Sequence, residues 1–273
     1  MDTFDAVAYI NEPRWQKVSL GLTRVQLLLE KLGRPQDTLR FVHVAGTNGK
    51  GSTCAYLDSI LRAAGYRTGL FTSPYIECFE ERIRVDGQNI SPAELRAVTL
   101  EVRDAARGVE ARLGEHPTEF ELMCAVALCY FAQQHCDIVV LEVGLGGRLD
   151  ATNVIEHPEV CAITPIALDH TAILGNTLEE IAAEKAGILK PGVPVVSWPQ
   201  EPQAMAVVRA KAQEVGCPLT VLDLDALEMG GLRIAGFAEC GNSAEQHEPG
   251  GRIGRPFAPS SPSDRLGGGE IPR

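Results

Sequence analysis

Three short clusters of glycine, lysine, carboxylate and histidine residues could handle a polyphosphate. The first is GTNGKGS, which begins at Gly46; Gly49 and Gly51 would let backbone amides approach a phosphate, and Lys50 would neutralise its charge. The standard phosphate-loop pattern is G-x-x-x-x-G-K-[ST], and this stretch departs from it because Gly51 separates Lys50 from Ser52. An ordinary glycine turn with an exposed lysine is the alternative; a strand before the loop and a helix after it favour phosphate binding.

The other two clusters follow apolar runs. Glu142 ends the run IVVLE, so it is either a strand-end residue that reaches water or a Mg²⁺ ligand, because a buried carboxylate needs a partner. Asp169 and His170 follow the run ITPIAL, and His170 is either structural or a ligand. Lys185 is either a solvated surface lysine or a member of the same site. Because parallel strands end at one edge of a sheet, we expect Lys50, Glu142 and His170 to converge there.

The elements that must position these residues alternate along the chain. Strands are expected over residues 40–46, 68–74, 137–144, 159–167, 193–198 and 218–222. Helices are expected over residues 20–33, 52–65, 91–114, 118–134, 177–187 and 202–215. Ser91, Thr118 and Thr177 are predicted N-caps because a glutamate follows each by three residues. The continuous apolar runs predict an α/β fold with a mostly parallel sheet flanked by helices.

Composition limits the partners and the number of domains. The 273 residues are 45% apolar and carry a net charge of −11, which argues against a nucleic acid or an anionic membrane as partner. No secretion signal or 18-residue apolar run is present, so we expect a cytoplasmic protein with reduced cysteines. Residues 1–229 are expected to form the folded domain. Residues 230–273 are rich in glycine and proline, which predicts a disordered tail.

Five motifs together resemble the folylpolyglutamate synthase and dihydrofolate synthase family of the Mur ligase superfamily. They are HVAGTNGKGST, FTSPYIECFEERIRVDG, TEFE, LEVGLGGRLDATN and LDHTAILGNTLEEIAAEKAGI, and the resemblance covers residues 20–222. The spelling G-T-N-G-K-G-[ST] is typical of this family. Tyr75 stands where many members have histidine, and Pro165 stands where serine is common; neither is an expected ligand. The resemblance implies a phosphate-loop fold similar to the Mur ligase central domain.

The resemblance also implies an activity and a set of site residues. The activity is ATP-dependent addition of L-glutamate to dihydropteroate, to the glutamate of tetrahydrofolate, or to both, through an acyl phosphate and with Mg²⁺. ATP would be bound by Gly46, Thr47, Asn48, Gly49, Lys50, Gly51 and Ser52, and Mg²⁺ by Ser73, Glu142 and His170. Lys50, His170 and Lys185 would be catalytic, and Lys185 matches a family lysine that can be carbamylated. The pterin end of the substrate would lie near Arg24, Phe120 and Asp150.

The end of the chain leaves the function open. Family members continue into a C-terminal α/β domain, and nothing after Leu222 resembles it. We therefore expect the ATP- and folate-binding portion of a ligase, altered near Met229 by truncation or a frame change, or a natural short form. A catalytically inactive nucleotide-binding fragment and a Mur-type ligase with another substrate are the alternatives. The expected partners are small-molecule substrates, without nucleic acid or membrane, and the protein is expected to be a monomer.

Overall fold

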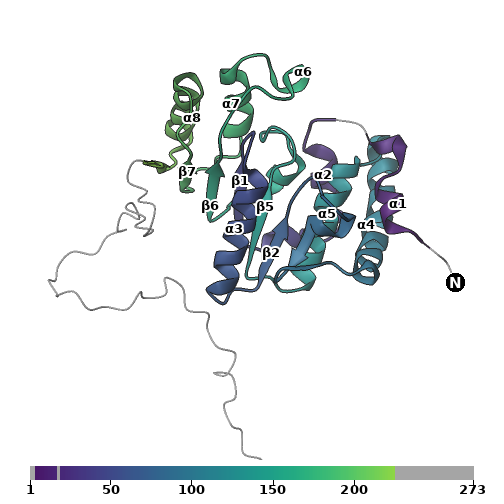
Figure 1. Ribbon diagram of the computed structural model, residues 1–273. Coiled ribbons are helices and arrows are strands. Elements are labelled where there is room, and N and C mark those ends of the chain that lie inside the picture. Colours follow the sequence, from purple (N-terminus) through teal and green to yellow (C-terminus); the bar gives the residue numbers. More distant parts are fainter. Residues whose placement is uncertain (1–3, 17–18, 225–273) are drawn as a thin grey trace, which may run out of the picture. The chain divides into compact units, whose positions relative to one another are not determined.

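The computed structural model describes residues 4–16 and 19–224, all of which lie in one compact unit (Figure 1). The predicted boundary near Met229 and the predicted tail, residues 230–273, lie outside these residues. The helices are α1 (Ala6–Ile10), α2 (Thr23–Lys31), α3 (Lys50–Ala63), α4 (Pro92–Leu113), α5 (Glu119–Gln133), α6 (Thr171–Leu174), α7 (Leu178–Ala186) and α8 (Pro202–Val215). Short 3-10 helices cover Pro13–Trp15, Pro35–Thr38, Phe79–Arg82 and Ala151–Val154.

A single eight-stranded sheet organises the described part of the chain. Its strands are β1 (Phe41–Ala45), β2 (Thr68–Phe71), β3 (Ile83–Val85), β4 (Gln88–Asn89), β5 (Ile138–Glu142), β6 (Val160–Ile163), β7 (Val195–Ser197) and β8 (Leu219–Val221). The strand order is β4-β3-β2-β5-β1-β6-β7-β8. In this order, every pairing from β2 through β5, β1, β6 and β7 to β8 is parallel. At one edge, β3 pairs antiparallel with both β2 and β4. The predicted mostly parallel sheet is confirmed.

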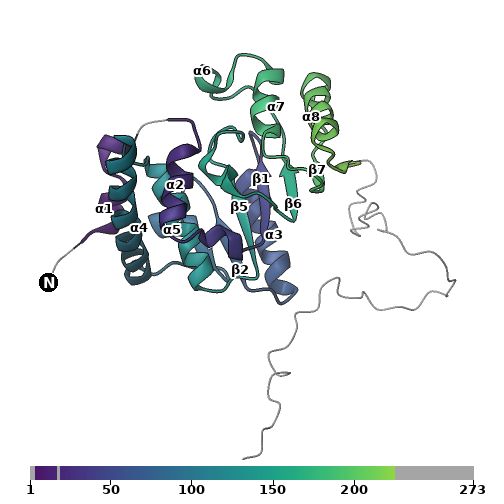
Figure 2. The same ribbon diagram turned by 180° about the vertical axis from the view of Figure 1, so that it is seen from behind.

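Helices cover both faces of this sheet (Figures 1 and 2). Because successive strand residues point to opposite faces, Val139 and Leu141 face the helices α1, α2, α4 and α5, whereas Val140 faces α3. Over β6 and β7, the side chains of Cys161 and Ile163 pack with α7 and α8. The central strands are therefore apolar on both sides, as their continuous apolar sequences predict.

Capping boxes define three of the helix starts. In each, the side chain of Ser91, Thr118 or Thr177 accepts a hydrogen bond from the backbone of the glutamate three residues later, and that glutamate accepts from the cap residue. All three N-cap predictions are confirmed. Along α5, nearly every side chain from Glu121 to Phe131 is buried, so this helix is the centre of the largest core cluster.

The residues predicted to bind phosphate and metal lie at or just after the ends of four neighbouring strands. In the sheet, β2, β5, β1 and β6 are adjacent and parallel, so the loops that follow them meet at one edge. The loops approach so closely that a Cβ on Gly46 would lie 1.8 Å from the Thr164 hydroxyl, which explains the glycine there. Among the described residues, no helix combines the length and apolar character needed to cross a membrane.

Candidate functional site

The glycine-lysine loop has the structural context that phosphate binding requires. Strand β1 ends at Ala45, Gly49 is the N-cap with φ of 79°, and α3 begins at Lys50. The first four amides of a helix have no intrahelical partner, and they lie at the positive end of its dipole. The Lys50 ammonium donates to the Thr47 carbonyl at 3.1 Å, so the lysine lies across the loop. Residues 49–52 thus form a helix N-terminus whose free amides suit an anion, so they are more than an ordinary turn.

Glu142 faces this helix N-terminus from the end of β5. Its side chain is 4% exposed, and its Oε2 accepts a hydrogen bond from the Ser73 amide at 3.0 Å. Burial raises the pKa of the carboxyl, and the Ser73 amide and the Lys50 charge oppose the rise. A Cβ on Gly51 would lie 3.6 Å from Oε2, which places the first turn of α3 against the carboxylate. Glu142 therefore does not reach bulk water; its charge and position suit a bound cation.

Lys185 is buried on α7 beneath the glycine-lysine loop. It is 4% exposed, and its Nζ donates to the Gly46 carbonyl at 2.8 Å. Burial and the nearby Lys50 charge lower the pKa of Lys185 to about 8, against the opposing effect of Asp169 and Asp150. The surface-lysine interpretation is therefore wrong. A buried amine with this pKa can carry a neutral nitrogen near physiological pH.

His170 lies at the same sheet edge but is more open. It is the N-cap of α6, its side chain is 56% exposed, and its Nε2 lies 3.7 Å from the Asp169 carboxylate. The described residues contain no group of three or more His, Cys, Asp or Glu side chains that could hold a metal. Ser73, Glu142 and His170 therefore form no closed metal cage. Mg²⁺ does not need one, because it keeps several water and phosphate oxygens as ligands.

A cavity of about 680 Å³ opens beside Ser73. Among the described residues, its wall comes from residues 11–16 and 19–21, the segment after β2, the start of α5, and the loop after β5. Phe120 and Asp150, both predicted to contact substrate, line this cavity, and so does Ser73. Because the Ser73 amide binds Glu142, and Glu142 lies against Gly51, the cavity adjoins the start of α3.

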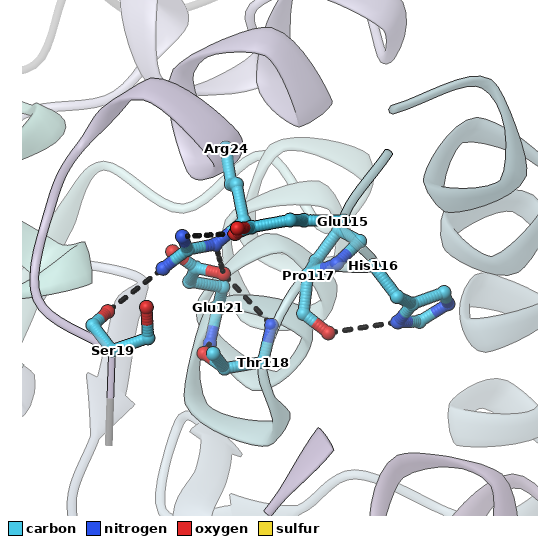
Figure 3. A network of polar contacts seen from close by, with 7 residues as sticks. All are labelled: Ser19, Arg24, Glu115, His116, Pro117, Thr118 and Glu121. Carbon is cyan, nitrogen blue, oxygen red and sulfur yellow. Dashed lines mark hydrogen bonds and ion pairs between the residues drawn. The ribbon is translucent and has the colours of Figure 1, made fainter. Parts of the chain in front are cut away.

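Arg24 supports the cavity wall from α2, as Figure 3 shows. Its side chain is 11% exposed, and it donates to Glu121 Oε2 at 3.0 Å, to Glu115 Oε2 at 3.1 Å and to the Ser19 carbonyl at 2.8 Å. Ser19 and Glu121 line the cavity. Since each guanidinium nitrogen has a protein partner, the arrangement supports a positioning role for Arg24, and its contact with substrate stays a prediction.

Glu121 was not singled out as a site residue in the sequence. Its Oε2 accepts from Arg24 and from the Thr118 amide at 2.7 Å, but its buried Oε1 has no partner among the described residues. An unpaired buried carboxylate oxygen is costly, so a ligand in the cavity would supply the missing donor. The available signal was the motif TEFE, where the capping glutamate was explained by helix capping alone.

Asp150 belongs to a buried chain of hydrogen bonds. Its carboxylate accepts from the Thr152 hydroxyl at 2.6 Å, from the Thr152 amide at 3.0 Å and from the Leu145 amide at 2.8 Å. Since the Thr152 hydroxyl donates to Asp150, it accepts from His43 Nε2 at 2.9 Å. Burial lowers the pKa of His43 to about 3, so the ring is neutral. This chain fixes the loop after β5, which forms one side of the cavity.

Aromatic and cationic side chains complete the cavity. Phe120 packs over Gly144, where an added Cβ would lie 2.3 Å from its ring, so residue 144 must be glycine. Arg82 lies over the Tyr75 ring at 5.1 Å and donates to Glu119 Oε1 at 2.7 Å. Sequence reasoning did not select Arg82 or Glu119, although both lie in quoted motifs. Tyr75, which stands where many family members have histidine, contacts Arg82 with its ring and forms part of the cavity wall.

Comparisons with known proteins place this geometry in a family. Residues 44–222 match the Mur ligase middle domain. Dihydrofolate synthase/folylpolyglutamate synthase of Bacillus subtilis is 47% identical over 219 residues, covering 80% of this chain and 51% of that protein. A solved FPGS–AMPPCP–folate complex is 41% identical with a TM-score of 0.77, covering 82% of this chain and 55% of that chain. An E. coli FolC structure with DHPP and ADP is 38% identical with a TM-score of 0.72, covering 80% and 51%. This chain thus spans about half the length of the relatives it matches.

Proposed function

We propose a function from one premise: this chain belongs to the Mur ligase family, in the branch of folylpolyglutamate and dihydrofolate synthases. The proposed function is the ATP- and folate-binding part of a ligase that adds L-glutamate to dihydropteroate, to the glutamate of tetrahydrofolate, or to both. One observation carries the proposal. Ser73 lines the cavity while its amide binds Glu142 at the anion-binding edge, so a substrate carboxylate can lie next to the phosphates.

The residues support this chemistry step by step. The α3 amides and Lys50 would bind ATP phosphates, so that a substrate carboxylate oxygen attacks the terminal phosphorus, the bond to the β-phosphate oxygen breaks, and an acyl phosphate and ADP form. The amine of L-glutamate then attacks the acyl carbon, and the tetrahedral intermediate releases phosphate and leaves an amide. Mg²⁺, held by Ser73 and Glu142 with a second ion near His170, would neutralise the phosphate charge when bound.

The cavity suits a flat heterocycle with several N–H donors. Glu121 Oε1 supplies an unpaired acceptor, and Phe120 supplies an aromatic face. The 2-amino-4-oxopteridine ring of a folate has such donors. Because the relative solved with AMPPCP and folate has the same fold, a pteroate fits this proposal better than a cell-wall precursor.

The proposal is tested first by binding. Titration calorimetry of the complete 273-residue chain with Mg²⁺ and ADP should detect binding that Lys50→Ala weakens at least 10-fold. Lys211→Ala is the matched control, because Lys211 pairs with Glu214 on α8 away from the glycine-lysine loop. Absence of nucleotide binding by the unmodified chain would overturn the proposal.

Turnover then separates the proposed ligase from its alternatives. Phosphate release from ATP that requires both dihydropteroate and L-glutamate supports the ligase. Binding of ATP and dihydropteroate without phosphate release supports an inactive nucleotide-binding protein instead. A Mur-type ligase with another substrate would release phosphate from ATP in the presence of that substrate, but not in the presence of dihydropteroate or tetrahydrofolate. The proposal includes small-molecule substrates, a monomeric state and a cytoplasmic location. Sedimentation velocity tests whether the protein is a monomer.

A further inference from the structure

Thr47 joins two of the loops at the sheet edge through both its side chain and its backbone. The Thr47 hydroxyl donates to the Ala167 carbonyl at 3.0 Å and accepts from the Ala167 amide at 3.1 Å. In addition, the backbone amides of Thr47 and Asn48 donate to the Pro165 carbonyl at 2.9 and 3.2 Å. The glycine-lysine loop after β1 is thus bonded in both directions to the loop after β6.

Because of these contacts, both the hydroxyl and the backbone amide of Thr47 already have protein partners. Its amide and that of Asn48 point to Pro165, and its hydroxyl uses its one proton on Ala167. The amides that remain for an anion are those at the start of α3. The assignment of Thr47 and Asn48 to ATP stays a prediction, and the geometry adds a second task for Thr47, which is to bind the loop after β6.

The loop after β6 is held from its other side as well. Gln200 accepts from the Ile166 amide at 2.9 Å and donates to the Thr164 carbonyl at 3.1 Å. Residues 164–167 therefore lie between Gln200 and Thr47. Asp169 and His170 follow Ala167 by two and three residues, so the position of Ala167 limits where they can lie.

We propose that Thr47 is a positioning residue that holds the loop carrying Asp169 and His170 in register with the phosphate-binding N-terminus of α3. The hydroxyl is essential because only a group that donates and accepts can bond both the carbonyl and the amide of Ala167. A nucleotide bound to α3 thereby stabilises the His170 loop without touching Ala167. This second statement rests on the proposed function, whereas the bond to Ala167 exists in the ligand-free protein.

Amide hydrogen exchange of the complete chain tests the ligand-free part. Thr47→Val keeps the side-chain shape but loses the hydroxyl, and Thr47→Ser keeps the hydroxyl as the matched control. Thr47→Val should speed exchange at Ala167 roughly 10-fold, and Thr47→Ser should leave it within about 2-fold of the unmodified protein. Equal exchange at Ala167 in all three proteins would overturn the proposal. Thr47→Ala replaces Thr47→Val if far-ultraviolet circular dichroism shows that the latter does not fold.

The same proteins test the nucleotide part. Mg²⁺ with ADP should slow exchange of residues 166–170 in the unmodified and Thr47→Ser proteins, but in Thr47→Val it should slow only residues 46–53. Equal slowing of residues 166–170 in Thr47→Val would contradict the coupling. If the unmodified chain binds no ADP, the proposed function fails, while the exchange of Ala167 without ligand still decides the role of Thr47.

Discussion

The cavity wall and the sheet edge proposed to bind nucleotide are built differently. In and behind the cavity wall, Glu121 and Asp150 are buried, the Arg24 side chain is 11% exposed, and each has fixed protein partners. At the edge, Glu142 and Lys185 are buried, but Asp169 and His170 are more than half exposed and contact mainly each other. The protein alone therefore holds the cavity wall in place, whereas the exposed part of the edge leaves its charged groups open to ligands. Glu142→Gln at the edge should therefore weaken ligand binding without loss of stability, whereas Thr152→Val behind the cavity wall should lower the unfolding free energy.

The largest effect is expected for Glu142→Gln at the edge. The neutral amide cannot balance a cation, so binding of ADP with Mg²⁺ should weaken about 100-fold, on the order of 3 kcal/mol. Because burial raises the pKa of Glu142, removing its charge should keep or increase the melting temperature. Calorimetry and thermal melting measure both quantities. Glu214→Gln, at an exposed position, is the control. Normal ADP binding by the Glu142→Gln protein would show that the edge does not use the charge of Glu142.

The pH dependence of the unfolding free energy tests whether Lys185 is buried at the sheet edge. Burial lowers its pKa from 10.5 to about 8, so the folded state releases this proton before the unfolded state does. Its contribution to the unfolding free energy should therefore rise between pH 8 and 10.5, by about 3 kcal/mol at most. Buried thiols oppose this slope, because burial raises the pKa of Cys129, Cys136 and Cys161 to about 12.

The Lys185 contribution is obtained as a difference. Urea unfolding of the unmodified chain and of Lys185→Met across pH 7 to 10.5 isolates it, because the thiols are common to both. The unmodified protein should gain stability relative to Lys185→Met as the pH rises. Parallel curves would show that Lys185 is not a buried amine.

Glu121→Gln tests the cavity. The substitution removes the charge that faces Arg24 and changes the unpaired oxygen, so dihydropteroate should bind roughly 30-fold more weakly, about 2 kcal/mol. ADP binding should not change. Glu115→Gln is the matched control because Glu115 binds the same arginine but is 54% exposed, and its loss should cost less than about 0.5 kcal/mol. Equal losses for both variants would mean that the cavity does not use Glu121.

The smallest effect is expected for Thr152→Val, at a buried residue behind the wall of the cavity. It breaks the bonds from His43 and to Asp150, so the unfolding free energy should fall by about 1 to 2 kcal/mol. Thr152→Ser should restore most of it. Urea denaturation measures the change, and an unchanged midpoint for Thr152→Val would show that the cavity wall is not held by this chain of hydrogen bonds.

Much of the fold followed from local patterns. The capping glutamates at Glu94, Glu121 and Glu180 set helix starts that need only neighbouring residues, and the apolar runs were long enough to indicate parallel strands. The hairpin of β3 and β4 was missed, although Asp86–Gly87 is a typical hairpin turn. Its strands of three and two residues were too short to show a periodicity.

The site was harder to predict because its contacts join distant segments. The sequence placed Lys50, Glu142 and His170 at one edge, since strand ends suffice for that inference. It could not show that Lys185 is buried under Gly46, which depends on how α7 packs. Nor could it show that Thr47 binds Ala167, because that requires the register of β1 against β6. Backbone contacts of this kind leave no signature in the residue types.

The short hairpin also affects how the protein behaves at high concentration. Strand β4 has two residues, and the turn beside it uses left-handed backbone at Asp86 and Gly87, with φ of 50° and 77°. Such a strand offers few open backbone groups for a strand of another molecule. Intermolecular sheet growth, the first step toward aggregation, is therefore discouraged at this side.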